Sequence, residues 1–509
     1  MHLVERFRRT ISEWHDTVAV SHEDQRVSYG ELGRLTANVS AHLLRQGLER
    51  GDRVAILVAN SANYIAIYYG IWAAGGMTVA LNTQAKARDI VNWTRHAGAK
   101  WLFVDASHPE LDRISELTKD TIEIIRVGKH NDSDQGDEIW QGIVKSAESF
   151  PEIALEESDL ASIIYTSGTT GQPKGVTLSH ANLAANVDSI LSYLKLNHTD
   201  SIVNVLPFYY SYGNSILHTY IAVGAKLVLE NNLLYPHRVI ERISNEGVTG
   251  FSGVPSTFSL ILGRVKLENY DLSCLRYLTQ AGGPMPPAIT DRLIDTLPQV
   301  KLFIMYGQTE ASARLSYLPS DKVLEKRGSI GIAIPGVTLE IRDKAGNVVA
   351  PGQTGEICAK GPNIMRGYWL DEEKTNQAIV DGWLHTGDLA HYDEDGYIYI
   401  DGRSSEMIKS GGNRISPKEV EEIIQEIEGV QEVAVVGVKD EVLGEVIKAY
   451  VVPAVGANID MRAIQRYCKQ NLAVYKIPKF VELVQVIPKT ASGKVQRFAL
   501  QKMHEQNGS

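Results

Sequence analysis

The segment from residue 165 to residue 176 reads Tyr-Thr-Ser-Gly-Thr-Thr-Gly-Gln-Pro-Lys-Gly-Val and follows the apolar run of residues 161–164. Its glycines allow backbone N–H groups to turn inward as an anion-binding nest, because no Cβ atom obstructs them. The hydroxyls supply further donors, and the lysine supplies a point charge. The segment therefore predicts a strand that runs into a phosphate-binding loop. The candidate phosphate-binding residues are Thr166, Ser167, Gly168, Thr169, Thr170, Gly171 and Lys174.

This loop does not fit the Walker pattern, which requires Gly, four residues and then Gly-Lys-Ser/Thr. A kinase or GTPase of that type therefore loses support. A surface turn is the structural alternative, since Gly, Ser and Thr are ordinary turn residues. The length of the string and its position after an apolar strand favour the phosphate-binding interpretation.

The loop closely resembles the phosphate-binding signature of the adenylate-forming superfamily, which includes acyl-CoA synthetases, aryl-CoA ligases, luciferases and peptide-synthetase adenylation domains. Further segments resemble the motifs of the same family, in the same order, along nearly the whole chain. They are residues 206–213, 281–286, 306–310, 382–388, 401–414 and 488–497.

Composition is consistent with a soluble multidomain enzyme. The chain has 509 residues, a length that exceeds what one hydrophobic core usually supports. Of these residues, 44% are hydrophobic, which is enough to form more than one core. Its formal net charge of −10 argues against general nucleic-acid binding. Residues 462–509 are nevertheless basic, with nine Lys and Arg against two Asp and Glu. This segment suits an anionic ligand such as ATP or CoA, although a solvated basic face explains it equally well.

The chain carries no clear targeting signal, and we expect a cytoplasmic protein. Three widely spaced cysteines give neither a disulfide framework nor a metal cluster. The N-terminal residues lack the apolar core of a signal peptide, and the C-terminal residues are no peroxisomal address. Residues 64–81 are almost uncharged, but glycines and tyrosines interrupt them. We expect a buried helix and strand there and no transmembrane segment.

The apolar runs predict an α/β fold. Runs at residues 54–58, 101–104, 202–206 and 302–305 alternate with segments of helical length. This alternation predicts a large N-terminal domain of stacked, mostly parallel sheets covered by helices. Residues 330–400 have shorter runs with glycine turns, which predicts an antiparallel, β-barrel-like subdomain.

A boundary is predicted near residue 401, where the pattern becomes helix, strand, strand, helix, strand. Residues 1–401 are then the N-terminal adenylation domain, and residues 402–509 form a small α+β C-terminal domain. Ser416 is the expected N-cap of its first helix, with Pro417 at the first position and Glu419 completing a capping box. The family resemblance implies that this domain is mobile and that the active site lies between the two domains.

The resemblance also implies roles at the nucleotide. In the segment of residues 306–310, which includes Gly307, Tyr306 would stack on adenine. Thr309 would bind the α-phosphate, and Glu310 would hold Mg²⁺. The same segment follows an apolar strand, where ligands of α/β proteins usually bind. The other wall of the adenine slot would comprise Ala281, Gly282, Gly283 and Pro284.

Three further cationic and acidic positions follow from the resemblance. Asp388 would accept hydrogen bonds from the ribose hydroxyls, and Arg403 would contact ribose or phosphate. Lys494 would be the catalytic lysine, with its ammonium between the carboxylate and α-phosphate oxygens. Each of these residues taken alone is more typical of a turn or a charged surface.

A second half-reaction, thioester formation, is implied as well. Lys409 and Arg414 belong to a segment that resembles the loop entering the site for that step. Ser405 occupies the hinge position, where the family usually has Asp or Lys. Rotation of the C-terminal domain would remove Lys494 and bring in the loop that contains Lys409.

Substrate pocket residues are expected at Tyr210, Ser211, Ser252 and Gly253. Amino-acid-activating relatives have an aspartate where Ser211 stands, so we expect a neutral-tailed aliphatic or aromatic acid. The acceptor is either CoA or the phosphopantetheine of an acidic carrier protein, because both types of member share these motifs. The expected reaction is ATP-dependent formation of acyl-AMP, followed by transfer to a thiol. A homodimer is compatible with the sequence.

Overall fold

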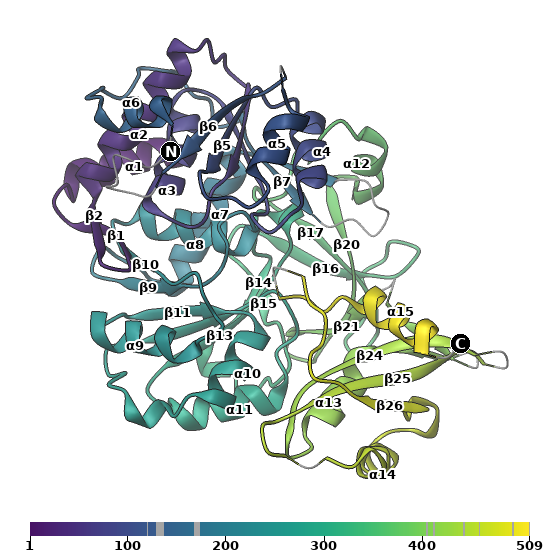
Figure 1. Cartoon of the computed structure of the whole chain (residues 1–509). Helices are drawn as coiled ribbons and strands as arrows, with labels where there is room; N and C mark the ends of the chain where they lie inside the picture. The colour runs from purple at the N-terminus through teal and green to yellow at the C-terminus, as the bar shows by residue number, and fades with distance from the viewer. Residues whose placement is uncertain are drawn as a thin grey trace.

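The computed structural model describes residues 1–119, 121–128, 137–166, 174–403, 406–410, 413–440, 443–457, 459–490 and 493–507. Figure 1 shows the N-terminal elements in purple to teal and the C-terminal strands β24–β26 grouped at the lower right. Two mostly parallel sheets, one antiparallel sheet and one C-terminal sheet make up the described chain. The architecture is thus the α/β arrangement predicted from the alternating apolar runs.

The first sheet has nine strands, and its central pairs are all parallel. Antiparallel strands occur at its two ends. In spatial order it comprises β15 (Ile332–Ala333), β14 (Ser316–Leu318), β13 (Lys301–Tyr306), β12 (Tyr277–Gln280), β11 (Gly250–Gly253), β9 (Ser201–Asn204), β10 (Lys226–Leu229), β1 (Val18–His22) and β2 (Gln25–Ser28).

The second sheet has seven strands, and only β18 and β8 pair in the antiparallel sense with their neighbours. Its order is β18 (Gly367–Tyr368), β8 (Lys174–Ser179), β7 (Leu160–Thr166), β4 (Met77–Ala80), β3 (Arg53–Leu57), β5 (Trp101–Asp105) and β6 (Glu123–Val127).

Alternate side chains of β3 face two different cores, as the two-residue period of a strand requires. Val54 and Ile56 belong to the large central core, whereas Ala55 and Leu57 pack in a smaller cluster. That smaller cluster includes residues of α4 (Ala87–Ala97) and α5 (Leu111–Leu117). The seven-stranded sheet is therefore covered by helices on both faces, which explains its continuous apolar runs.

The central core contains helices that pack against one another between the sheets. Every residue of α3 (Ala62–Ala73) is buried, and α8 (Ser211–Ala222) is buried along most of its length. The Tyr69 hydroxyl of α3 lies 3.0 Å from Nδ1 of His218 in α8. Helix α3 and strand β4 are the elements predicted at residues 64–81. No helix among the described residues is long and apolar enough to span a membrane.

The remaining N-terminal helices pack on these layers, and α7 lies beside α8 (Figure 1). They are α1 (Leu3–Glu13), α2 (Tyr29–Arg45), α6 (Glu138–Lys145), α7 (His180–Leu194), α9 (Pro236–Glu246), α10 (Pro255–Arg264), α11 (Pro287–Thr296) and α12 (Glu372–Ala378).

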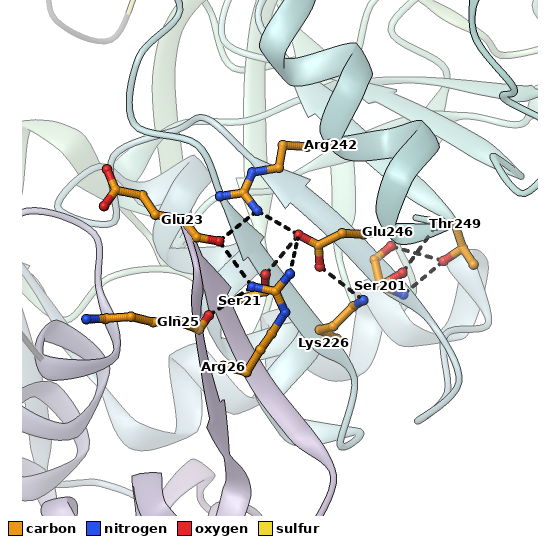
Figure 2. Close-up of polar contacts among 9 residues, drawn as sticks. All are labelled: Ser21, Glu23, Gln25, Arg26, Ser201, Lys226, Arg242, Glu246 and Thr249. Atoms are coloured by element: carbon orange, nitrogen blue, oxygen red, sulfur yellow. Dashed lines mark hydrogen bonds and ion pairs between the residues drawn. The ribbon is translucent and has the colours of Figure 1, made fainter. Parts of the chain in front are cut away.

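A buried carboxylate connects α9 to strands β1, β2 and β10 of the nine-stranded sheet (Figure 2). Glu246, at the end of α9, accepts hydrogen bonds from Ser21 of β1 at 2.9 Å and from Arg242 at 2.8 Å. Arg26 of β2 and Lys226 of β10 each lie 3.4 Å from its carboxylate. Burial alone would raise the pKa of Glu246. The hydrogen bond from Ser21 and the charges of the three cations outweigh burial and lower this pKa.

The antiparallel subdomain predicted at residues 330–400 has five strands. Strand β20 pairs with three neighbours along its length, which makes it the centre of this sheet. The strands are β16 (Thr338–Arg342), β17 (Gly355–Lys360), β20 (Trp383–Tyr392), β19 (Ile379–Val380) and β21 (Ile398–Arg403).

The C-terminal domain has its own sheet and its own apolar core, which includes Val420, Val435 and Ile464. The predicted order of helix, strand, strand, helix, strand is present, preceded by a short hairpin and followed by a helix. Its elements are β22 (Ile408–Ser410), β23 (Asn413–Ile415), α13 (Pro417–Gln425), β24 (Val430–Asp440), β25 (Gly444–Pro453), α14 (Met461–Asn471), β26 (Phe480–Leu483) and α15 (Arg497–Asn507).

The positions predicted at the start of α13 are correct, but the predicted hydrogen bonds of the capping box do not form. Ser416 is the N-cap and Pro417 is at the first position, but the Ser416 side chain accepts no cap hydrogen bond. Its Oγ is buried, and no described residue hydrogen-bonds to it. The Glu419 carboxylate instead accepts a hydrogen bond from the Lys476 ammonium. A full charge nearby thus competes successfully with the backbone N–H for this carboxylate.

Candidate active site

A cavity of about 580 Å³ lies between the N-terminal domain and the C-terminal domain. Residues of both domains line it, including the loop after β12, the end of β13, the ends of β20 and β21, and the hairpin before α15. Eight of the residues predicted from the sequence line this cleft. They are Gly282, Gly283, Pro284, Tyr306, Gly307, Asp388, Arg403 and Lys494.

Asp388 is the centre of a buried polar group in the cleft. It lies on β20 directly opposite Arg403 on β21, and Arg403 Nε donates to its Oδ1 at 3.0 Å. The Tyr306 hydroxyl, at the end of β13, donates to Oδ2 at 2.7 Å. Burial first, and then the Asp388 charge, hold the pKa of Tyr306 well above its usual range. The Asp388 charge likewise raises the pKa of Arg403.

The turn after Tyr306 requires glycine at position 307. A Cβ atom there would lie 2.0 Å from the backbone oxygen of Ala313. The 3₁₀ turn η2 (Thr309–Ala311) follows, and the Thr309 hydroxyl lies 3.3 Å from the Ser211 hydroxyl at the start of α8. The segment therefore turns sharply at the carboxyl end of β13 and directs Thr309 toward the first residue of α8.

Glu310 has a partner that the sequence did not indicate. The Tyr368 hydroxyl, on β18, donates to Glu310 Oε1 at 2.8 Å. Lys174 Nζ lies over the Tyr368 ring, 5.7 Å from its centroid. Burial, followed by the Glu310 charge, raises the pKa of Tyr368. Tyr368 thus connects the base of the predicted phosphate loop to Glu310.

Two antiparallel strands flank the predicted phosphate-binding loop. Thr166 ends β7, and Lys174 begins β8 directly opposite it. Ser167, Gly168, Thr169, Thr170 and Gly171 lie outside the described residues. The strand before the loop is the one that the sequence predicted, whereas its antiparallel partner β8 after the loop was not predicted.

Lys494 enters the cleft on a hairpin of the C-terminal domain. Its backbone N–H donates to Thr490 Oγ1 at 3.1 Å, and residues 489 and 495 form an isolated bridge. The ammonium is open to the water of the cleft, while atoms of both domains surround it. This partial desolvation, followed by the Arg403 charge, lowers the pKa of Lys494, whereas Glu310, Asp388 and Glu406 oppose the shift.

The loop after β12 forms another wall of the cleft. Gly282 has φ +88°, and a Cβ atom there would lie 3.1 Å from Val254 Cγ1. The backbone oxygen of Gly283 accepts a hydrogen bond from Gln280 Nε2 at 2.8 Å, and Ala281 is buried. Since Gly282 and Gly283 have no side chains, backbone forms this surface, as a flat ligand would require.

Other predicted residues lie away from this cleft. Lys409 does not line it: it lies on β22 opposite Arg414 on β23, and its backbone N–H donates to Glu445 at 2.7 Å. Tyr210 packs against Tyr209, with ring centroids 4.6 Å apart. A Cβ atom on Gly253 would lie 3.0 Å from Thr257.

Ser252 lines a second, much smaller cavity of about 20 Å³ behind the cleft. Met305 lines both cavities and therefore lies between them. The small cavity also includes Arg314, which the sequence analysis did not single out. The available signal was a lone arginine between the small residues 311–313 and the apolar strand β14.

Two models of known protein families match most of the chain. A sequence model described as "AMP-binding enzyme" matches residues 7–369, and one described as "AMP-binding enzyme C-terminal domain" matches residues 419–494.

Named relatives include a feruloyl-CoA synthase of an Amycolatopsis species, 33% identical over 491 residues, with 96% of both chains covered. A 2-succinylbenzoate–CoA ligase of Bacillus mycoides is 32% identical over 493 residues, again with 96% of both chains covered. A long-chain-fatty-acid–CoA ligase of Bacillus subtilis is 31% identical over 522 residues, covering 97% of this chain and 92% of the relative.

Solved structures are similar over the same extent. MatB of Rhodopseudomonas palustris, bound to ATP, superposes with a TM-score of 0.89 at 28% identity, with 100% of both chains covered. The anthranilate CoA ligase AuaEII, in complex with anthranoyl-AMP, gives a TM-score of 0.90 at 25% identity, covering 100% of this chain and 98% of that one.

Proposed function

The chain belongs to the AMP-binding enzyme family and is an AMP-forming acid–CoA ligase, and we propose that its interdomain cleft is the site of acyl-AMP formation. ATP and CoA are its co-substrates, and a carboxylic acid is activated with release of pyrophosphate. One observation supports this position of the site: the same cleft is lined by Tyr306, Asp388, Arg403 and Lys494. These residues come from separate segments of both domains.

The nucleoside of ATP binds at Asp388 in this proposal. The adenine lies between the backbone of Gly282 and Gly283 and the ring of Tyr306. The Asp388 carboxylate accepts hydrogen bonds from ribose hydroxyls, which is favourable because Arg403 and Tyr306 hold it in place. Arg403 remains half-exposed toward the cleft and can also reach ribose or phosphate oxygens.

The reacting groups lie beyond the ribose. The phosphates bind the loop between Thr166 and Lys174, and Thr309 donates to the α-phosphate. The Lys494 ammonium lies between the acid carboxylate and the α-phosphate, where it offsets their mutual repulsion as they approach. A carboxylate oxygen then attacks the α-phosphorus, the bond to the β-phosphate oxygen breaks, and pyrophosphate leaves with both electrons of that bond.

Glu310 is suited to a Mg²⁺ ion. One of its carboxylate oxygens accepts the Tyr368 hydrogen bond, and the other has no hydrogen bond among the described residues. A single carboxylate combined with phosphate oxygens and water is an ordinary ligand set for Mg²⁺. When bound there, the ion would neutralise charge on the leaving pyrophosphate.

Thioester formation follows when the C-terminal domain rotates in this proposal. The rotation moves Lys494 out of the cleft and brings in the hairpin of Lys409 and Arg414, which lies elsewhere in this structure. The thiol of CoA then attacks the acyl carbonyl, and AMP leaves with the electrons of the acyl–phosphate bond. We place the domain boundary at residue 401, and the hinge residue Ser405 lies outside the described residues.

The acid is not expected to be an α-amino acid. Ser211 contacts Thr309 but carries no charge to pair with an α-ammonium. An unpaired ammonium buried beside it would be costly. The named relatives act on acids as different as ferulate and long-chain fatty acids, so they do not define the tail of the acid.

The test is pyrophosphate release over a panel of aliphatic, aromatic and amino acids, with ATP and Mg²⁺, in the presence and absence of CoA. We expect release that depends on an acid and is stimulated by CoA, with acyl-CoA and AMP as products. Lys494→Ala should abolish most of this release, whereas the matched control Lys502→Ala should not, because Lys502 is exposed and does not line the cleft. Release that is indifferent to CoA but stimulated by a phosphopantetheinylated carrier protein would contradict CoA as the acceptor.

A further inference from the structure

Arg314 is a buried cation behind the proposed reaction site. It follows η2, precedes β14, and is only 3% exposed. Its guanidinium lies over the ring of Tyr212, with Cζ 4.2 Å from the ring centroid. A cation–π contact of this kind stabilises a guanidinium, but it does not replace a counter-ion. Burying an arginine here therefore has a cost that the contact with Tyr212 leaves partly uncompensated.

Among the described residues, no carboxylate lies within ion-pair distance of Arg314. Its Nη1 donates to the backbone oxygen of Ala313 at 3.4 Å and its guanidinium also interacts with the Tyr193 hydroxyl, but its Nε has no hydrogen-bond partner among the described residues. Buried guanidinium groups in proteins are normally paired with acids. The side chain is thus a charged donor group without a counter-ion, and the described part of the protein satisfies it only in part.

Two other unpaired donors line the same cavity of about 20 Å³. The hydroxyl groups of Tyr220 and Tyr277 are buried, and neither has a hydrogen-bond partner among the described residues. Together with Arg314 Nε they give three donor groups around one small space. The complementary group is a hydrogen-bond acceptor, and the charge of Arg314 favours an anion.

Helix α8 connects this space to the proposed reaction site. Ser211 contacts Thr309, while Ser215 and Thr219 follow at intervals of four residues on the same helix face and line the small cavity. From Ser211 to Thr219 the helix rises by about 12 Å. An acid whose first carboxylate lies at Thr309 and Lys494 would therefore extend its far end along α8 toward Arg314.

We propose that the acid substrate carries a second anionic group at its far end, a carboxylate that pairs with Arg314. The inference rests on the proposed ligase function and refines its acid to a dicarboxylic acid. It departs from the neutral tail expected from Ser211, because that expectation considered the ammonium partner alone. The small volume allows only a compact far end, and Met305, a flexible side chain, is the group that can yield between the two cavities.

The test compares matched acids that differ only in the second carboxylate, over chain lengths that reach the rise of about 12 Å along α8: glutarate with pentanoate, suberate with octanoate, and sebacate with decanoate. The readout is the ratio of kcat/KM for diacid to that for monoacid, from pyrophosphate release in the presence of CoA. We expect the unaltered protein to favour a diacid by at least about 30-fold, because the monoacid leaves Arg314 buried and unpaired.

Arg314→Met keeps the length of the side chain and removes its charge, so it should abolish the diacid preference and improve use of the monoacid. Arg314→Lys should retain part of the preference. Arg276→Met is the matched control, because Arg276 lies over the Tyr277 ring but is half-exposed, pairs with Asp200 and does not line the small cavity. It should leave the ratio unchanged.

A preference of the unaltered protein for monoacids, or a ratio that Arg314→Met does not alter, would overturn the inference and leave the ligase function intact. If Arg314→Met does not fold, the ratio for the unaltered protein and its change in Arg314→Lys decide the question in the same way. Absence of pyrophosphate release with every acid would contradict the ligase function itself, and the inference with it.

Discussion

A Cβ atom on Gly493 would lie 2.9 Å from Cγ2 of Val254, so the hairpin that carries Lys494 is in direct contact with the N-terminal domain. Val254 is the N-cap residue of α10, and Gly493 has φ +80°. Both observations restrict position 493 to glycine: one through backbone conformation, the other through the space available between the two domains. We expect this contact to help to hold Lys494 in the cleft.

Gly493→Ala should therefore lower acyl-AMP formation by roughly 10- to 100-fold, because the added methyl group displaces the Lys494 hairpin from Val254. Thioester formation from supplied acyl-AMP should change little. Gly456→Ala is the matched control: Gly456 has φ +79° but has no atom within 4 Å of an added Cβ. Equal losses in both variants would show that backbone strain, and not the contact with Val254, is responsible.

The pH dependence of acyl-AMP formation should report the Lys494 ammonium. Desolvation and Arg403 lower the pKa of Lys494 below its ordinary 10.5, so the positive charge is lost at a pH below 10.5 as the pH rises. The rate at saturating ATP and acid should fall across this range. Lys494→Arg should retain some activity and shift the fall to higher pH, since arginine stays protonated. An identical profile in Lys494→Arg would exclude this group as the one that titrates.

Tyr306→Phe removes the hydrogen bond to Asp388 Oδ2 and keeps the ring. If Asp388 binds the ribose and Tyr306 holds it in position, the KM for ATP should rise by about tenfold, with a smaller effect on kcat. Tyr392→Phe is the control, because the Tyr392 hydroxyl hydrogen-bonds backbone groups in the antiparallel subdomain, away from the cleft. An unchanged KM for ATP in Tyr306→Phe would remove this hydroxyl from the nucleotide site.

Glu246→Gln should destabilise the N-terminal domain by about 1–3 kcal/mol at neutral pH, because Arg242, Lys226 and Arg26 lose their shared counter-ion. The folded-state pKa of Glu246 is lowered from 4.5, so its stabilisation is complete above about pH 4.5 and is lost as the pH falls through the lower folded-state value. Urea unfolding at pH 7 and at progressively lower pH should show the difference between the two proteins diminish.

The matched control for that experiment is Glu13→Gln. Glu13 lies 3.8 Å from Arg9, and both side chains are half-exposed, so this change should alter stability by less than about 0.5 kcal/mol. Equal effects of the two substitutions would contradict the importance of the network around Glu246.

The strands predicted from apolar runs are present in the structure. They could be predicted because a strand that is buried on both faces of a parallel sheet has a continuous run of apolar residues. Strand β13 and helix α3 lie where the sequence predicted them. The capping box predicted at Ser416 is absent, because the Glu419 carboxylate accepts a hydrogen bond from Lys476 instead. Lys476 lies about sixty residues further along the chain. Local patterns do not report such distant charges.

In the candidate site, too, some residues could be predicted from local sequence patterns and others could not. Tyr306, Asp388, Arg403 and Lys494 lie in segments with recognisable patterns, and the cleft brings them together. Tyr368 and Arg314 have no pattern of their own, since their importance lies in contacts with Glu310 and Tyr212 that only the fold creates. A buried arginine is also indistinguishable in sequence from an exposed one.

One experiment separates the two half-reactions of the proposed ligase in a single sample. The protein is mixed with ATP, Mg²⁺ and its acid in the absence of CoA, and bound acyl-AMP is measured by mass spectrometry together with released pyrophosphate. We predict equal amounts of acyl-AMP and pyrophosphate, followed by conversion of the acyl-AMP to acyl-CoA and AMP when CoA is added. Release of ADP and phosphate, or acyl-AMP that CoA does not consume, would contradict an AMP-forming acid–CoA ligase.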